Sequence, residues 1–372
     1  MITKQTETNQ LLKNIGNQFL IYGDFISGVC YGSGHINDTY CVNYDQSGTV
    51  VKYLFQRINH NLFKDVPGLM SNISRTCEHI QKELRKNKSS NASRRSLSLI
   101  KTHSGTDFLH INQNFWRIYL FIEDATGYDI VENETQAYEA AKAFGEFQKL
   151  LVKLPGDRLV ETIPDFHNSR KRYATLEKAI KDDSVDRVKS CQAEIEWAIK
   201  NKELANALLA LFEKGLIPER ITHNDTKLNN VLIDNKTQKA TCVIDLDTIM
   251  PGLALYDFGD LVRTSTSPAA EDETDLTKVK MQMNMFEALT KGYLESAGDF
   301  LNESEIENLP VAGMTITYTI GLRFLTDYLQ GDTYFKTTHP EHNLERCKTQ
   351  FKLVQSMQEQ KQVMLDCVNA LK

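Results

Sequence analysis

Hydrophobic and polar positions follow two different periods along this chain. In the first third, short apolar runs with a period near two are separated by turns rich in Gly, Asn, Asp and Ser, a pattern typical of antiparallel strands. A tight turn at 32–34 divides two such runs, and a turn at 45–48 leads into the next. We therefore expect strands on both sides of the first turn, and further strands at residues 50–59, 97–100 and 115–122.

Elsewhere apolar residues recur every three or four positions, which predicts helices with one buried face. One of these helices falls inside the strand-rich part, where Asp65 and Pro67 form a helix start signal. A short amphipathic helix is expected to precede the first strand. The expected helices cover residues 9–20, 66–85, 134–151, 165–181, 185–214, 276–296, 303–330 and 341–371.

The change of period locates a boundary near residue 123. The polar segment 123–127 ends the last expected strand of the first part. A chain of 372 residues is long for a single core, so we expect two lobes, residues 1–122 and 123–372. The predicted fold class is α+β, with a small antiparallel sheet and one helix in the first lobe and a larger, mainly helical second lobe.

Composition narrows the classes of function. A net charge of −6 argues against a general nucleic-acid-binding protein, which would be basic. No apolar run approaches the length of a membrane span, and the first residues lack the apolar core of a signal peptide. The seven cysteines form no C-x-x-C pair and are expected to be reduced thiols. We expect a cytoplasmic protein with no nucleic-acid or membrane partner, and the oligomeric state stays open.

The most specific chemical pattern lies in residues 221–260. Asp225 is followed five positions later by Asn230, and Asp245 comes directly after the apolar run 242–244. Kinases use this spacing, because an acid must meet the acceptor hydroxyl while an amide and a second acid hold magnesium on the ATP phosphates. We therefore assign Asp225 as the base, Asn230 and Asp245 as magnesium ligands, and Lys227 as a cation for the transferring phosphoryl group. Taken one at a time, each of these residues could instead have a structural role in a helix cap or a turn.

The candidate nucleotide contacts lie in the first part of the chain. A glycine turn lets backbone N–H groups approach phosphates, a cation on the third strand can touch them, and the polar segment after the last strand can meet adenine. Lys52 is the second choice for the cation. A plain hairpin turn and solvated strand side chains are the alternatives. The candidates are Gly32, Ser33, Gly34, Arg57 and Glu123.

Two departures from the protein-kinase pattern point to a family of small-molecule kinases. His223-Asn224-Asp225 stands in place of H-R-D, and no D-F-G occurs at Asp245. The stretch resembles instead the aminoglycoside phosphotransferase and choline kinase superfamily, which implies a bilobal protein-kinase-like fold. Within that superfamily, G-S-G-H-I-N-D-T-Y at 32–40 and F-Q-R-I-N-H at 55–60 resemble the N-acetylhexosamine 1-kinases.

That resemblance implies an activity and a sugar site. The family phosphorylates the anomeric C1 hydroxyl of N-acetylglucosamine or N-acetylgalactosamine, with ATP and magnesium. The positions that match its sugar contacts are His35, Arg323 and Tyr334, beside Asp225. The alternative for Arg323 is an ion pair with Asp327 at i,i+4 on a helix surface. Rival functions are a kinase of the same superfamily for choline, homoserine or an aminoglycoside, and a catalytically silent nucleotide-binding module.

Other residues of these motifs receive supporting roles. His223 is expected to brace the catalytic loop rather than contact substrate, and Asp257 is expected to be structural. Asp247 is expected either to touch the metal or to support its loop. Glu78, on the helix at 66–85, is expected to be exposed rather than paired with the strand cation. The basic segment 85–96 is expected to be a solvated loop.

Overall fold

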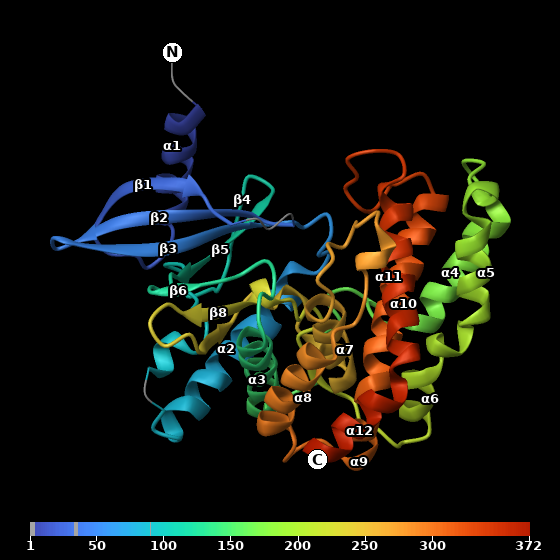
Figure 1. Cartoon of the computed structure of the whole chain (residues 1–372). Coiled ribbons are helices and arrows are strands. Elements are labelled where there is room, and N and C mark those ends of the chain that lie inside the picture. Colours follow the sequence, from blue (N-terminus) through green and yellow to red (C-terminus); the bar gives the residue numbers. More distant parts are fainter. Residues whose placement is uncertain (1–3, 33–35, 90) are drawn as a thin grey trace.

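The computed structural model describes residues 4–32, 36–89 and 91–372 of the chain. An antiparallel sheet stands beside a larger part built mainly of helices (Figure 1). The predicted α+β class is therefore confirmed. The expected boundary between residues 122 and 123 falls in the connection between the end of the sheet at Leu120 and the next strand, which begins at Ala125.

The large sheet has five antiparallel strands in the order β1-β2-β3-β5-β4. The turn at 45–48 joins β2 to β3 directly, as the sequence predicts. The expected strand at 97–100 forms only an isolated bridge between Leu99 and Tyr119. The bounds are β1 (Asp24–Cys30), β2 (Asp38–Gln46), β3 (Thr49–Ile58), β4 (Leu109–Ile111) and β5 (Asn114–Leu120).

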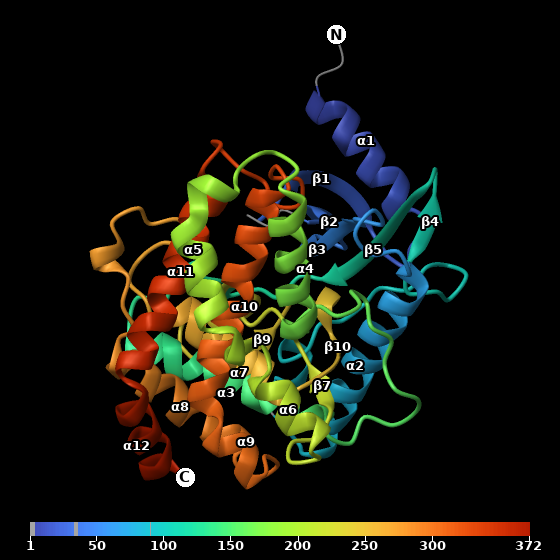
Figure 2. The ribbon, with the colours of Figure 1, turned by 90° about the vertical axis from the view of Figure 1, so that its right-hand side faces the viewer.

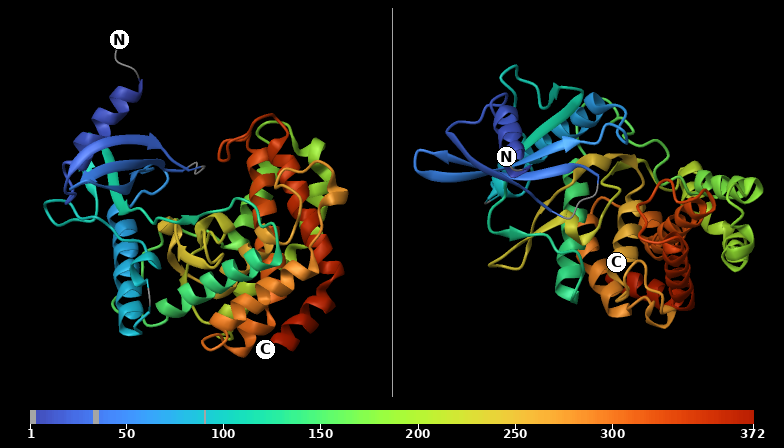
Figure 3. Two further views of the ribbon diagram at one scale, coloured as in Figure 1. Left: turned by 60° about the vertical axis from the view of Figure 1, so that its left-hand side comes forward. Right: turned by 90° about the horizontal axis from the view of Figure 1, so that it is seen from above.

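Helix α1 (Lys4–Gly16) covers the side of the sheet that faces away from the helical part (Figures 1 and 3). Its Leu12 is fully buried against Phe55 and other apolar side chains of the sheet. The helix begins and ends earlier than the expected range 9–20, because the chain leaves it at Gly16 and Phe19 then pairs with Thr102 as a bridge.

Side chains of β3 and β5 alternate between the two faces of the sheet. Phe55 and its partner Ile118 point toward α1. The neighbouring pair, Gln56 and Arg117, lies on the opposite face, which is turned toward the helical part. Any residue of β3 that reaches the catalytic loop must therefore share the face of Gln56.

Helix α2 (Val66–Lys86) confirms the predicted helix at 66–85. The side chain of Asp65 caps it by accepting a hydrogen bond from Gly68 N at 2.9 Å, and Pro67 occupies its first turn. Glu78 is exposed and its carboxylate lies 3.7 Å from Lys101 Nζ, so it is not paired with a strand cation.

Two small sheets position the catalytic segments. The predicted hairpin is confirmed as β8 (Val231–Asp234) and β9 (Ala240–Val243), to which β6 (Ala125–Thr126) adds a third strand. A second pair joins β7 (Arg220–Thr222) to β10 (Met250–Gly252). The segment 223–230 therefore begins at one small sheet and ends at the other.

The helical part is organised around α10 (Leu309–Leu329), which packs against α4, α7 and α11. Figure 2 shows α4 and α5 (Gln192–Lys200) on the outer side of this group. Although α10 is buried on almost every side, none of the described helices is long and apolar enough to cross a membrane. The other main helices are α3 (Glu134–Leu151), α4 (Ser169–Asp182), α7 (Ala254–Ser265), α8 (Met283–Ala297) and α11 (His342–Glu359).

Glycine allows α3 and α8 to approach closely. A Cβ atom at Gly292 of α8 would lie 2.2 Å from the carbonyl oxygen of Tyr138 in α3, which is too close for any side chain. The two helices therefore pack backbone to backbone.

Several expected long helices are interrupted. Residues 276–296 begin with a short 3-10 turn, so α8 starts later than predicted, and 303–330 and 341–371 are each two helices. The apolar period continues through these breaks because both pieces face the same core, so periodicity does not reveal the bend. The pieces are η2 (Val188–Cys191), α5 (Gln192–Lys200), η3 (Lys202–Ala205) and α6 (Ala207–Glu213) within 185–214, η6 (Leu276–Lys278), α9 (Glu303–Glu307) and α12 (Lys361–Leu371).

Candidate active site

The catalytic loop at 223–230 is held in place by buried hydrogen bonds. His223 is fully buried, and its Nε2 lies 2.8 Å from the carbonyl oxygen of Ile244. Its Nδ1 accepts the backbone N–H of Asp225 at 3.3 Å. His223 thus links the loop to the strand end that carries Asp245, in agreement with the bracing role predicted for it.

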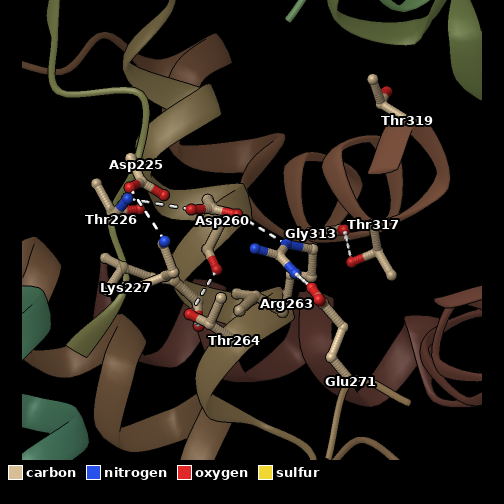
Figure 4. Close-up of polar contacts among 12 residues, drawn as sticks. Asp225, Thr226, Lys227, Asp260, Arg263, Thr264, Glu271, Gly313, Thr317 and Thr319 are labelled. Carbon is tan, nitrogen blue, oxygen red and sulfur yellow. Dashed lines mark hydrogen bonds and ion pairs between the residues drawn. The ribbon is translucent and has the colours of Figure 1, made fainter. Parts of the chain in front are cut away.

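Two buried carboxylates from α7 bind the backbone of the same loop. Asp257 accepts the N–H groups of His223 and Asn224 at 2.9 and 2.7 Å. Asp260 accepts the N–H of Thr226 at 3.0 Å and pairs with Arg263 (Figure 4). The expected structural role of Asp257 fits these contacts, whereas the role of Asp260 was not anticipated from the sequence.

Asp225 and Lys227 lie together at the open side of this loop (Figure 4). Lys227 Nζ is 3.2 Å from Asp225 Oδ2, and the two side chains are 43% and 26% exposed. Burial opposes the charge of Lys227, but the carboxylates of Asp225 and Asp260 outweigh it and raise the pKa of the ammonium group. A charged lysine therefore stands beside an accessible carboxylate, as the assigned roles require.

The structure brings Asn230 next to Asp225 and to the strand end at Asp245. Asn230 Nδ2 donates to the carbonyl oxygen of Asp225 at 2.7 Å and to its Oδ2 at 3.1 Å. The carbonyl oxygen of Asn230 accepts the N–H of Ile244 at 2.9 Å. With its amide nitrogen engaged, Asn230 keeps its Oδ1 as the oxygen available for a metal ion.

Asp245 has a backbone conformation that is uncommon for a residue other than glycine. It adopts a left-handed conformation with φ 59°, a conformation that costs free energy for a residue other than glycine. Loss of hydration raises the pKa of its carboxyl group, and the neighbouring carboxylates of Asp247 and Asp225 raise it further. A cation at this place would relieve the repulsion.

These residues fit magnesium better than a metal held by protein alone. Among the described residues, no cluster of three or more His, Cys, Asp and Glu side chains could enclose an ion. Magnesium commonly takes one or two carboxylates and completes its shell with phosphate oxygens and water. Asp245 and Asn230 Oδ1 offer such an incomplete shell.

Asp247 supports the metal loop from the sheet. Its carboxylate forms an ion pair with Arg117 of β5, and the two side chains are 5% and 1% exposed. Arg117 Nε also donates to Gln56 Oε1 at 2.9 Å, and Asn37 Nδ2 donates to Asp247 Oδ2 at 2.5 Å. Of the two roles left open for Asp247, these contacts favour support of the loop.

The candidate phosphate contacts are only partly described. Gly32 has a positive φ of 80°, which suits a tight turn, whereas Ser33, Gly34 and His35 lie outside the described residues. Arg57 pairs with Asp38 on β2. In the register of β3 it shares the face of Phe55 rather than that of Gln56, so the structure does not bring Arg57 to the face turned toward the catalytic loop.

Glu123 lies at the connection between the sheet and the helical part. Its side chain pairs with Lys52 of β3 at 3.0 Å, and its carbonyl oxygen accepts Arg94 Nη2 at 2.7 Å. Arg94 also pairs with Asp234 at 2.8 Å. The segment 85–96 was expected to be a solvated loop, but through Arg94 it ties the connection to the β8–β9 hairpin.

Arg323 and Tyr334 meet as the resemblance implies. Arg323 Nη2 lies 3.4 Å from the hydroxyl of Tyr334, and its guanidinium group also stacks on Phe166 and Phe335, with Cζ 5.2 and 5.3 Å from the ring centres. The alternative pairing with Asp327 is wrong. Asp327 is buried and instead accepts the backbone N–H groups of residues 333–335 at 2.8–2.9 Å, which fixes the loop that carries Tyr334.

Known structures share this arrangement of a sheet and a helical part. An aminoglycoside phosphotransferase from Alicyclobacillus acidocaldarius superposes with a TM-score of 0.59 at 12% identity, over 96% of this chain and 95% of that one. A choline kinase from Cryptosporidium parvum gives 0.56 at 15% identity, over 97% and 98%. A spectinomycin phosphotransferase, solved with ADP and spectinomycin, gives 0.54 at 13% identity, over 100% and 99%. These similarities confirm the kinase-like fold.

The family follows from the sequence itself. A sequence profile described as the phosphotransferase enzyme family matches residues 31–281. The matched region runs from the glycine turn through the catalytic loop and Asp245, and it covers more than half of the chain. The chain therefore belongs to the phosphotransferase enzyme family.

Proposed function

We propose that the protein is an ATP- and magnesium-dependent kinase that phosphorylates the C1 hydroxyl of N-acetylhexosamines. The observation that carries this proposal is the contact between Arg323 and Tyr334, the two residues that match the sugar contacts of the N-acetylhexosamine 1-kinases. Asp327 holds the loop on which Tyr334 lies. Arginine donates hydrogen bonds to hydroxyl and acetamido oxygens, and tyrosine adds a ring face and a hydroxyl. The products are the sugar 1-phosphate and ADP.

Asp225 orients the acceptor hydroxyl and takes its proton. The hydroxyl oxygen forms a bond to the γ-phosphorus of ATP while the bond from that phosphorus to the ADP oxygen breaks, and the proton passes to the Asp225 carboxylate. Lys227, 3.2 Å from Asp225, offsets negative charge on the transferring group. When bound through Asp245 and Asn230 Oδ1, magnesium supplies further neutralisation of the phosphates.

The nucleotide lies between the sheet and the helical part in this proposal. Gly32, Ser33 and Gly34 are assigned to the phosphates, and backbone groups near Glu123 to adenine. Lys52 is on the face of β3 shared with Gln56, and it becomes the stronger candidate for a nucleotide contact than Arg57. His35, which lies outside the described residues, is assigned as a third sugar contact on the family resemblance alone.

A cationic acceptor fits the same site less well. Choline, ethanolamine and aminoglycosides carry positive charge and favour acidic or aromatic cages. Here the aromatic rings of Phe166, Tyr334 and Phe335 already surround the guanidinium group of Arg323. An added ammonium group would be repelled by it.

Mass spectrometry of reaction mixtures tests the proposal directly. The purified protein is incubated with ATP, magnesium and one acceptor at a time: N-acetylglucosamine, N-acetylgalactosamine, glucose, choline or kanamycin. A hexosamine phosphate that is lost on mild acid treatment, as an anomeric phosphate is, supports both the substrate and the position. Phosphorylated choline or kanamycin, without phosphorylated sugar, overturns the proposed acceptor and leaves the kinase chemistry in place. ATP binding without any product would favour a silent module.

A further inference from the structure

Two arginines from different helices contact the same residue, Phe166, near the catalytic loop. Arg172 of α4 donates to the carbonyl oxygen of Phe166 at 3.1 Å, and Arg323 of α10 stacks on the ring of the same Phe166. The adjacent His167 lies 2.9 Å through Nε2 from the carbonyl oxygen of Asn224, which precedes Asp225. The arginine pair is thus linked to the catalytic loop through residues 166 and 167, on the acceptor side of the site.

Neither arginine has an acidic partner. Among the described residues, no carboxylate lies within ion-pair distance of Arg172 or Arg323, and Arg172 Nε is buried without a hydrogen-bond acceptor. The remaining residues of the chain, 1–3, 33–35 and 90, include no Asp or Glu. Carboxylates on the surrounding segments are engaged elsewhere, in the pairs Asp165–Lys171 (2.6 Å), Asp332–Arg187 (2.5 Å) and Asp225–Lys227 (3.2 Å).

The pair is electrostatically unfavourable as it stands. Burial lowers the pKa of both guanidinium groups, and the charge of Arg323 lowers that of Arg172 further. Stacking on Phe166, Tyr334 and Phe335 compensates Arg323 in part, but no ring is in cation–π contact with Arg172 among the described residues. Both side chains are half-buried, but Arg172 Nε itself is buried, and no acceptor replaces its lost hydration.

We propose that Arg172 and Arg323 form an anion subsite, so that the preferred acceptor carries a carboxylate or phosphate group in addition to the hydroxyl that is phosphorylated. The inference rests on the proposed sugar kinase function and narrows its substrate class to N-acetylhexosamines that also carry an acidic group. Neutral acetamido and hydroxyl oxygens can accept hydrogen bonds from one guanidinium group, but they leave both charges uncompensated. An anion between the two groups receives charge-assisted hydrogen bonds from each.

The test compares matched neutral and acidic sugars. kcat/KM is measured for N-acetylglucosamine, its C6 carboxylate and its 6-phosphate with the full chain, ATP and magnesium. The wild type is expected to favour at least one acidic sugar by roughly 10- to 100-fold, as two charge-assisted hydrogen bonds allow. Whichever acidic sugar has the higher kcat/KM shows whether the subsite prefers a carboxylate or a phosphate group.

Three variants test whether the preference for acidic sugars arises from Arg172 and Arg323. Arg172→Met is expected to reduce the acidic-to-neutral ratio to about that of a neutral site, and Arg172→Lys to restore part of it. Arg170→Met is the matched control, because Arg170 lies on the same helix but is ion-paired with the exposed Glu213. Equal kcat/KM values for acidic and neutral sugars in the wild type would overturn the inference, as would a ratio that Arg172→Met leaves unchanged.

A second measurement separates failure of the proposed sugar kinase function from failure of the anion subsite. If no sugar is phosphorylated, calorimetric titration with inorganic phosphate still tests the subsite. Binding to the wild type and to Arg170→Met that is lost in Arg172→Met supports the anion subsite. Binding that is equal in all three proteins, or absent from the wild type, overturns it. Thermal unfolding of each variant ensures that only folded proteins are compared.

Discussion

The guanidinium group of Arg117, on β5 of the large sheet, forms a buried ion pair with the carboxylate of Asp247, two residues after the expected metal ligand Asp245. Protein kinases join the sheet to a helix through a strand lysine and a glutamate. Here Glu78 of α2 is exposed instead, and β5 reaches the metal loop directly. Asn37 donates to the same carboxylate, so Asp247 connects Asn37 and the sheet to the segment that follows Asp245.

Removal of Arg117 is expected to destabilise the fold strongly. Arg117→Met leaves the Asp247 carboxylate buried without a counter-charge, and such a change costs about 3–5 kcal/mol of unfolding free energy. Urea denaturation measures this loss. Arg57→Met is the control, because its ion pair with Asp38 is exposed and such pairs contribute about 0–1 kcal/mol. A smaller loss in Arg117→Met than in Arg57→Met would contradict the importance of the buried pair.

Asp225→Asn is expected to separate chemistry from nucleotide binding. The amide has the shape of the carboxylate but cannot take the hydroxyl proton, so kcat should fall by roughly 10²–10⁴-fold. The dissociation constant for ATP, measured by calorimetry, should stay close to that of the wild type. Full turnover by the variant would exclude Asp225 as the base.

Metal dependence tests the roles of Asp245 and Asn230. Removal of divalent cations with a chelator is expected to abolish turnover, and added magnesium should restore it. Asp245→Asn should raise the magnesium concentration that gives half-maximal rate by roughly 10-fold or more, because the site loses its only charged ligand. Asp366→Asn, on the surface of the last helix, serves as the control. An unchanged magnesium requirement in Asp245→Asn would refute the assignment.

His167 predicts a loss of stability in mild acid. Burial, against the opposing charge of Asp260, lowers its pKa to about 4 from an ordinary value of 6.5. Above pH 6.5 the imidazole is neutral in the folded and in the unfolded protein, so its full contribution to the free energy of unfolding is present. As the pH falls from 6.5 toward 4, the unfolded chain binds the proton and the folded chain does not, so the free energy of unfolding decreases by at most about 3 kcal/mol.

Denaturation at a series of pH values checks this dependence. His167→Gln should reduce the slope of unfolding free energy against pH between 6.5 and 4. His339→Gln is the control, because His339 is 43% exposed. Identical slopes in the wild type and in His167→Gln would show that the acid sensitivity arises elsewhere.

The local sequence pattern was sufficient to predict much of the catalytic centre. The hairpin that joins Asn230 to Asp245, the helix at 66–85 and the α+β class could all be predicted, because each depends on neighbouring residues and on a period within one segment. Helix α7 was not predicted, because its polar side chains Asp257 and Asp260 are buried against the catalytic loop instead of forming a solvent-exposed face. The breaks within 185–214 and 341–371 were missed for the related reason that both pieces face one core.

The sequence by itself determined the spacing of Asp225, Asn230 and Asp245, and with it the family of the chain. Only the tertiary structure decided which charges meet. The pair of Arg117 and Asp247 joins residues 130 positions apart, and Arg172 and Arg323 reach the same Phe166 only because α4 packs on α10. The face of β3 on which Arg57 lies also depends on its register with β5. Such contacts depend on how distant segments dock, and short-range periodicity contains no information about that docking.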